Sequence, residues 1–136
     1  MRYQFDLHPT DADVEEVRAG LIQHNTPFLA PVRRDRIACY AFEDERRVGG
    51  IVAEIWGHWL LIRFMWVHED RRGSGVGSAL LERLEDHART EGCLSALVDT
   101  FSFQAQPFYE RHGYRCRMVL ENYPVDTTLT YLDKTL

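Results

Sequence analysis

The sequence lacks the features that mark several large protein classes. It has 3 cysteines, at positions 39, 93 and 116, an odd number without the spacing of metal ligands. Its 6 histidines are scattered and form no pair at metal-ligand spacing, so we expect no metal site. No apolar run is long enough to span a bilayer, and Met1 begins no signal peptide. We therefore expect reduced thiols, a cytoplasmic location and no membrane partner.

Positive charge is also scarce. The chain has 16 Lys and Arg against 21 Asp and Glu, a formal net charge of −5, which argues against nucleic acid as a partner. A mildly acidic surface suits a cationic amine. With 136 residues, 45% hydrophobic and 27% charged, the chain fits one globular domain over residues 1–136. Such a domain buries about two-thirds of its unfolded surface.

Hydrophobic periodicity and turn residues predict a mixture of helices and strands. Thr10 is a good N-cap for a helix whose apolar stripe contains Val14, Val17 and Leu21. The segment 25–35 contains Pro27 and Pro31, so we expect a loop or a broken helix there. Strands are predicted over 3–8, 37–43, 48–56, 59–67, 94–100, 114–120 and 128–135, and further helices from residue 76 and over 104–112. This order predicts an α/β (α+β) domain with a mixed sheet.

The most informative segment is Arg72-Gly73-Ser74-Gly75-Val76-Gly77, between the apolar strand 59–67 and an amphipathic helix. A glycine-rich turn at a helix start binds anions, because its N–H groups and the positive end of the helix dipole converge. A P-loop would need Lys followed by Ser or Thr after the last glycine, whereas Gly77 is followed by Ser78 and Ala79. The dinucleotide fingerprint G-x-G-x-x-G is not met either. The segment therefore predicts a phosphate-bearing ligand of another class.

Two motifs identify a family resemblance. The pattern Arg-x-x-Gly-x-Gly at 72–77 resembles the coenzyme A pyrophosphate loop of the GNAT superfamily of acyl-CoA-dependent N-acyltransferases. About 30 residues later, Phe108-Tyr109 followed by Gly113-Tyr114 resembles the family's second motif. The resemblance spans residues 47–114 and points to a short single-domain member. It implies a central mixed, mostly antiparallel sheet of six to seven strands, splayed between the fourth and fifth strands and flanked by about four helices.

The resemblance also implies a reaction and a cofactor. It implies an enzyme that moves the acetyl group of acetyl-CoA, its co-substrate, to a primary amine of a small molecule or peptide by direct attack. The pantetheine arm would lie between the splayed strands like an added strand. Alignment on the glycine turn makes the N–H of Met65 the expected oxyanion donor and the N–H of Val67 the expected pantetheine contact. The expected contacts of the pyrophosphate are the backbone N–H groups of Arg72, Gly73, Ser74, Gly75, Val76 and Gly77, and the hydroxyl of Ser78.

Tyr109 is the expected general acid. A phenol with a pKa near ~10 keeps its proton at neutral pH and can donate it to the departing sulfur. The family places this tyrosine at the start of the short helix, facing the thiol. Ser102 stands where many relatives have an asparagine that binds the pantetheine or the pocket, and serine reaches less far.

The general base stays open, because the position where some relatives carry a glutamate is Leu61. Glu54 is the first carboxylate candidate, followed by His58 and then Asp99, and a chain of waters is as good an alternative as Glu54. Arg63 lies two residues after Leu61 and cannot act as a base. A cation there either disfavours an ammonium substrate or binds a carboxylate on the substrate.

The same residues fit a second function. Because Leu61 replaces a carboxylate, a non-catalytic acyl-CoA-binding sensor or regulatory module of the same fold is the alternative. A phosphate- or nucleotide-binding protein of unrelated fold is a third hypothesis, against which the second motif argues. The identity of the amine is not predicted; the irregular segments 24–35, 56–59 and 121–127 are expected to select it. Last strands in this family often meet across dimers, so a homodimer is one expectation.

Overall fold

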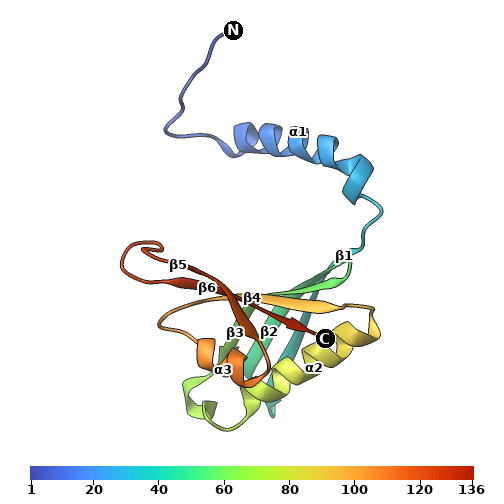
Figure 1. Ribbon diagram of the computed structural model, residues 1–136, viewed down its shortest axis with the longest axis vertical. Helices are drawn as coiled ribbons and strands as arrows, with labels where there is room; N and C mark the ends of the chain where they lie inside the picture. The colour runs from blue at the N-terminus through green and yellow to red at the C-terminus, as the bar shows by residue number, and fades with distance from the viewer. The chain divides into compact units, whose positions relative to one another are not determined.

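The structure is a computed structural model that describes residues 1–136 (Figure 1). In chain order its elements are α1 (Asp11–Leu29), β1 (Arg34–Glu43), β2 (Arg46–Trp56), β3 (Trp59–Val67), the 3-10 helix η1 (Glu69–Arg71), α2 (Val76–Thr90), β4 (Ser95–Phe101), α3 (Gln106–Arg111), β5 (Arg115–Leu120) and β6 (Leu129–Thr135). The chain divides into two compact units, Met1–Val32 and Arg33–Leu136. None of the helices is long and apolar enough to cross a membrane.

The first unit contains α1 and the residues ahead of it. As predicted, Thr10 caps the helix, since its hydroxyl oxygen accepts a hydrogen bond of 3.1 Å from the Asp13 N–H. The predicted strand at 3–8 is not formed, because these residues pair with no other strand and a strand needs a ladder partner.

The predicted loop or broken helix over 25–35 is also wrong in part, since α1 continues to Leu29. Pro27 lies inside the helix and removes only its own N–H from the last turn. The next hydrogen bonds survive: the Ala30 N–H donates to the Thr26 carbonyl at 3.0 Å, and the helix ends there. A proline close to a helix end therefore does not exclude helix on its N-terminal side.

The second unit is built on one six-stranded sheet in the order β1-β2-β3-β4-β6-β5. The pair β3–β4 is parallel, and the other four pairs are antiparallel. The predicted mixed, mostly antiparallel sheet is therefore confirmed, with six strands. The chain has three α-helices, not about four.

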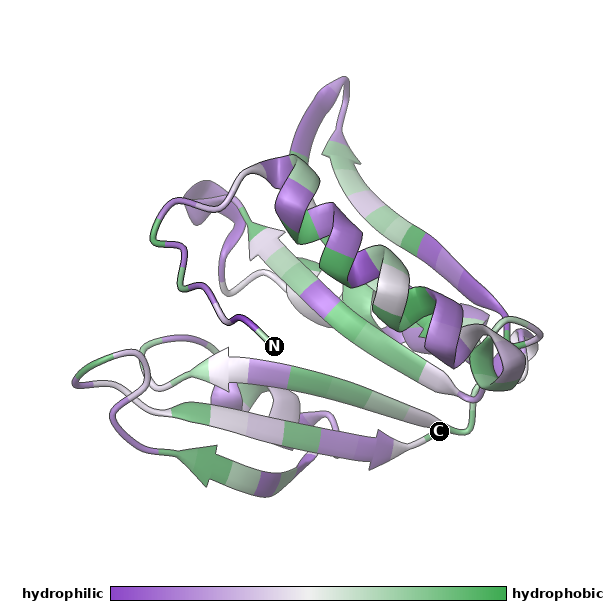
Figure 2. Cartoon of the chain, turned by 90° about the horizontal axis from the view of Figure 1, so that it is seen from above, coloured by the Kyte–Doolittle hydropathy of each residue, from purple (hydrophilic) through white to green (hydrophobic).

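The strands β3 and β4 part after a short shared stretch. Their register covers only Trp59 to Leu61 of β3, opposite Ser95 to Leu97 of β4. Figure 2 shows the two strands close together at their starts and diverging toward their ends. The predicted splay is confirmed; it lies between the third and fourth strands because the predicted first strand is not formed.

A β-bulge marks the point of divergence. Ile62 pairs with Ala53 and Phe64 pairs with Val52, so Arg63 is an extra residue without a partner on β2. A bulge increases the local twist and re-aims side chains. Arg63 and Phe64 are both exposed here, although alternation would send neighbouring side chains to opposite faces.

The core lies between the sheet and α2. One face of α2 is apolar at helical spacing, and strand alternation directs every second residue of β2 toward it. The buried residues of these two elements include Leu80, Leu81, Leu84 and Ala88 from α2 and Ile51, Ala53 and Ile55 from β2. This packing fixes the start of α2, and with it the glycine turn, at the end of β3.

Candidate active site

The splay opens two adjoining clefts. The strand cleft, of about 400 Å³, is lined by residues 62–65 of β3, residues 98–101 of β4, and Gln104, Ala105 and Tyr109. The loop cleft, of about 380 Å³, is lined by residues 71–73 and 75–78 together with Met65, Val67, Ala105, Phe108 and Arg111. Met65 and Ala105 line both clefts, so the two adjoin, and together they are called the channel.

The glycine turn presents unpaired backbone donors to the loop cleft. Gly73 and Gly75 have φ of +74° and +87°, in the left-handed region that favours glycine. Gly75 is the N-cap of α2, and the first N–H to re-enter backbone bonding is that of Ala79, which donates to the Gly75 carbonyl at 3.0 Å. The N–H groups of residues 73–78 donate to no backbone carbonyl. Together with the helix dipole, they form an anion site at the end of β3.

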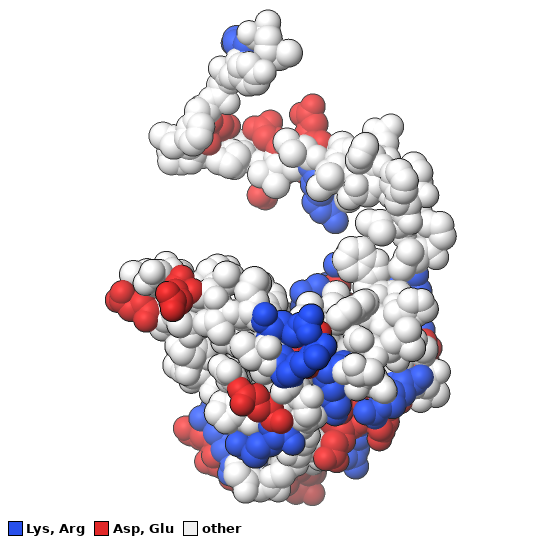
Figure 3. Space-filling view, viewed as in Figure 1, with Lys and Arg blue, Asp and Glu red and all other residues white.

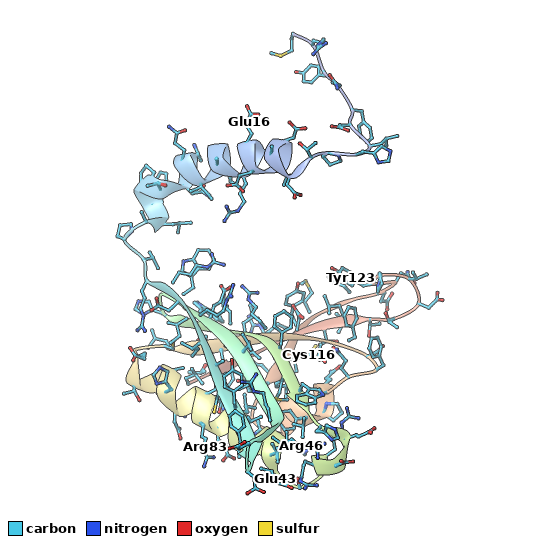
Figure 4. All side chains as sticks on the ribbon, turned by 180° about the vertical axis from the view of Figure 1, so that it is seen from behind. Glu16, Glu43, Arg46, Arg83, Cys116 and Tyr123 are labelled. Atoms are coloured by element: carbon cyan, nitrogen blue, oxygen red, sulfur yellow. The ribbon has the colours of Figure 1, made fainter.

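The two arginines ahead of the turn are held in different ways. Arg71 forms a bidentate ion pair with Glu43 of β1, and that hydrogen-bonded pair raises the pKa of Arg71 and lowers the pKa of Glu43. Figure 4 places Glu43, with Arg46, at the β1–β2 hairpin end of the sheet. The Nε of Arg72 donates to the carbonyl of Val67 at 3.1 Å. Arg71 therefore anchors the loop to the sheet, while Arg111 of α3 adds a further positive charge to this cleft.

Ser78 lies in the first turn of α2 and lines the loop cleft. Its hydroxyl is 2.9 Å from Nε2 of His112, which follows α3. The His112 ring in turn lies 4.8 Å, centroid to centroid, from the ring of Phe108. The predicted hydroxyl is thus oriented by a histidine that the sequence motif did not single out.

Beyond Leu61, the edge of β3 that faces β4 forms no strand pairing along the channel. The His68 N–H donates to the Val48 carbonyl of β2 at 2.7 Å, so it points toward β2. Because backbone groups alternate in direction along a strand, the N–H groups of Val67 and Met65 point to the opposite edge. No strand pairs with that edge beyond Leu61. Both predicted backbone donors therefore face the channel.

Tyr109 is a buried aromatic residue that lines the strand cleft. It lies on α3, is 5% exposed, and packs edge-on against Tyr114 with ring centroids 5.5 Å apart. Burial, and next the negative charge of Asp99, raises the pKa of Tyr109 to about 12. The phenol therefore keeps its proton over the whole neutral and mildly alkaline range.

The candidate bases differ sharply in position. Asp99 is exposed on β4 and lines the strand cleft, where its carboxylate has no ion-pair partner. Glu54 lines neither cleft, and its carboxylate lies 3.0 Å from Arg34 and 3.5 Å from Arg63. Desolvation acts to raise the pKa of Glu54, but the hydrogen bonds and charges of the two arginines outweigh it and lower the pKa. A carboxylate so held is a weak base.

Two other predicted residues lie outside the channel. His58 is in the β2–β3 turn, beside the closed end of the β3–β4 pair, and lines neither cleft. Ser102 follows β4, and its N–H donates to the Thr128 carbonyl at 3.0 Å. No three His, Cys, Asp or Glu side chains gather closely enough to hold a metal ion.

Sequence reasoning did not single out Thr100 and Gln104, which line the strand cleft. The Thr100 hydroxyl is buried and accepts a hydrogen bond of 3.2 Å from the Ala105 N–H. The Gln104 side-chain oxygen accepts one of 2.8 Å from the Phe101 N–H. These bonds fix the turn from β4 to α3 and so the position of Tyr109. The sequence feature that could have pointed to these residues is the polar pair Asp99-Thr100 near the end of an apolar strand.

Comparison with known proteins agrees with this geometry. The model of the acetyltransferase (GNAT) family matches residues 6–114. The chain belongs to the GNAT family. It is therefore an acyltransferase of the GNAT fold, and the resemblance read from its two motifs is confirmed.

Individual relatives share most of its length. A blasticidin-S acetyltransferase of Streptomyces morookaense is 37% identical over 113 residues, which cover 82% of this chain and 83% of that one. The crystal structure of an acetyltransferase from Bacillus cereus ATCC 14579 superposes with a TM-score of 0.87 at 32% identity, covering 98% of each chain. An aminoglycoside 6'-N-acetyltransferase, crystallised with coenzyme A, shares the fold with a TM-score of 0.68 at 22% identity over 93% of this chain and 81% of that one.

Proposed function

We propose that this GNAT enzyme moves the acetyl group of acetyl-CoA to a primary amine of a small molecule. The observation that carries the proposal is the channel made of the two adjoining clefts. It runs from the unpaired N–H groups of residues 73–78, along the free edge of β3, to the buried phenol of Tyr109. A phosphate-bearing thioester with an extended arm fits a channel with these three parts in this order.

In the proposed complex the cofactor is held mainly by backbone. The pyrophosphate accepts hydrogen bonds from residues 73–78, with Arg72, Ser78 and Arg111 close by. The pantetheine arm lies along β3 and bonds to the Val67 N–H, as an added strand would. This arrangement carries the thioester into the strand cleft next to Met65.

Within the strand cleft, the neutral amine attacks the thioester carbonyl carbon, forming the C–N bond. The Met65 N–H stabilises the oxyanion of the tetrahedral intermediate. As that intermediate collapses, the C–S bond breaks and Tyr109 donates its proton to the departing thiolate. The proton lost by the amine passes to Asp99, directly or through a water. We assign this last role to Asp99 rather than Glu54, because only the Asp99 carboxylate is both unpaired and in the cleft.

The test is amine-dependent thiol release from acetyl-CoA, with CoA binding followed calorimetrically on the same sample. A broad panel of primary amines is expected to give release with at least one member. Asp99→Asn is expected to lower kcat by about 10²-fold or more, the usual contribution of a general base, whereas Glu54→Gln is the matched control and changes kcat little. CoA binding without release from any amine would favour the sensor function instead. Loss of kcat in Glu54→Gln alone would return the base role to Glu54.

A further inference from the structure

The strand cleft contains one charge of each sign. Arg63 stands on the β3 wall and Asp99 on the β4 wall, and every other side chain that lines the cleft is uncharged. Both residues lie where the two strands have already diverged. A ligand in the cleft therefore meets a cation on one side and an anion on the other.

The bulge gives Arg63 its place in the cleft. As the extra residue of β3, it has no partner on β2, and it lies two positions beyond Leu61, the last residue that pairs with β4. Its side chain is 43% exposed, so the guanidinium remains accessible to a ligand. Bulges next to active sites commonly re-aim a side chain in this way.

The charge of Arg63 is only partly compensated. Glu54 is the one carboxylate that forms an ion pair with it, at 3.5 Å, the outer limit of a hydrogen bond. The same Glu54 oxygen is held more closely by Arg34, at 3.0 and 3.1 Å, and the Arg34 guanidinium is fixed 4.1 Å above the Trp56 ring. A guanidinium has five N–H donors, so Arg63 keeps most of its donors for a ligand.

The surrounding sheet face adds to this positive charge. Arg36 lies opposite Glu54 in the β1–β2 register, and cross-strand partners share a face. Arg34 and Arg63 thus contact the same carboxylate, and Arg36 stands opposite it in the register. Figure 3 shows side chains of both signs of charge on the surface of the sheet-bearing unit. This face attracts an anion, although the chain as a whole is acidic.

We propose that the acceptor is an amine that also carries a carboxylate, bound by Arg63 while Asp99 receives the amine. This inference rests on the proposed acetyl transfer and names its substrate class. The assignment of ends follows from position: Asp99 is close enough to Tyr109 for its charge to act on the phenol, so the amine end lies beside the thioester. The planar fork of a guanidinium matches a carboxylate in two parallel hydrogen bonds, which orients the acceptor.

The test compares linear ω-amino acids with n-alkylamines of matching length, which lack only the carboxylate. In the wild-type enzyme, kcat/KM is expected to favour the best ω-amino acid over its alkylamine by about tenfold or more, the effect of a hydrogen bond to a charged group. Arg63→Met is expected to reduce that ratio to near one. Arg83→Met is the control: it removes an exposed arginine of α2 that lines neither cleft and does not contact Glu54, and it is expected to keep the preference.

Each other outcome is decisive. Equal turnover of both series by the wild-type enzyme overturns this inference and leaves acetyl transfer intact. A preference that survives Arg63→Met, or disappears equally in Arg83→Met, also overturns it. If no amine is acetylated, the ω-amino acids are titrated calorimetrically into the CoA-saturated protein. Binding that Arg63→Met weakens about tenfold would support the site while the transfer proposal fails, and no binding at all would overturn both.

Discussion

The hydroxyl of Tyr114 donates a 2.7 Å hydrogen bond to the carboxylate of Glu85, a residue of α2 that is 2% exposed. The same carboxylate accepts hydrogen bonds of 2.9 and 3.1 Å from Nζ of Lys134 in β6. Burial and the bond to Glu85 raise the pKa of Tyr114 far above that of a free phenol. This network joins α2, β6 and the end of the second motif, and the Tyr114 ring packs against the Tyr109 ring. The motif tyrosine is thus a structural support for the proposed acid.

Removing Glu85 should therefore be costly. Glu85→Ala leaves a largely buried ammonium at Lys134 and an unpaired phenol at Tyr114, so we expect a loss of about 3 kcal/mol in the free energy of unfolding. Urea denaturation measures it. Glu82→Ala, an exposed position on the same helix, is the control and should change stability by less than about 0.5 kcal/mol. Similar losses in both variants would mean that the network contributes no more than an exposed glutamate of the same helix, since alanine itself favours a helix.

The glycine turn offers a matched pair of substitutions. Gly75 and Gly92 stand at the two ends of α2 with φ of +87° and +92°, and a Cβ at either position would meet no atom within 4 Å. Glu at either site costs about 1–3 kcal/mol of backbone strain, so both variants should lose similar stability. Only Gly75→Glu places a carboxylate beside the proposed pyrophosphate site. Calorimetry should show CoA binding lost in Gly75→Glu and kept in Gly92→Glu; equal CoA affinities would place the phosphates elsewhere.

Local signals predicted most of the second unit from the sequence. The strands β1 to β6, α2 and α3 all correspond to predicted segments, because alternation, helical spacing and turn glycines act over a few residues. The first unit was less predictable. Residues 3–8 have a strand-like pattern, but a strand forms only with a partner, and the pattern does not contain that information.

The backbone groups of the site were predicted well, and the side-chain ion pairs between distant strands were predicted less well. The turn 72–77 and the N–H groups of β3 follow from local order along the chain. The ion pairs of the site do not follow from local order. Strand pairing brings Arg34 to Glu54, 20 positions later in the chain, and the bulge at Arg63 breaks the alternation of side chains. For that reason the sequence ranks Glu54 above Asp99, whereas only Asp99 lines the cleft.

Removing the phenol of Tyr109 should separate chemistry from binding. Tyr109→Phe deletes a hydroxyl that makes no hydrogen bond within the protein, so stability and CoA affinity should change little. Loss of a general acid should lower kcat by about 10²–10⁴-fold. Tyr40→Phe, a half-exposed position on β1 outside both clefts, is the control and should leave kcat unchanged. If Tyr109→Phe retained wild-type kcat, the proton donor would be a water or another group.

The pH profile of kcat/KM for the amine tests the raised pKa of Tyr109. Burial and the charge of Asp99 raise this pKa to about 12, so the phenol is protonated at every pH below about 11. Loss of the catalytic proton of Tyr109 therefore does not lower the rate in the working pH range. An aliphatic ammonium with a pKa near ~10.4 loses its proton as the pH rises, so the rate should increase from neutral pH to about pH 10.5 without a maximum. The measurement is thiol release at saturating acetyl-CoA and subsaturating amine, corrected by an enzyme-free blank because thioesters hydrolyse in alkali. Tyr109→Phe should keep the rising limb at a lower rate. A wild-type rate that falls between about pH 8.5 and 10 while CoA stays bound requires a catalytic acid that titrates there, and a phenol buried in the strand cleft beside Asp99 does not.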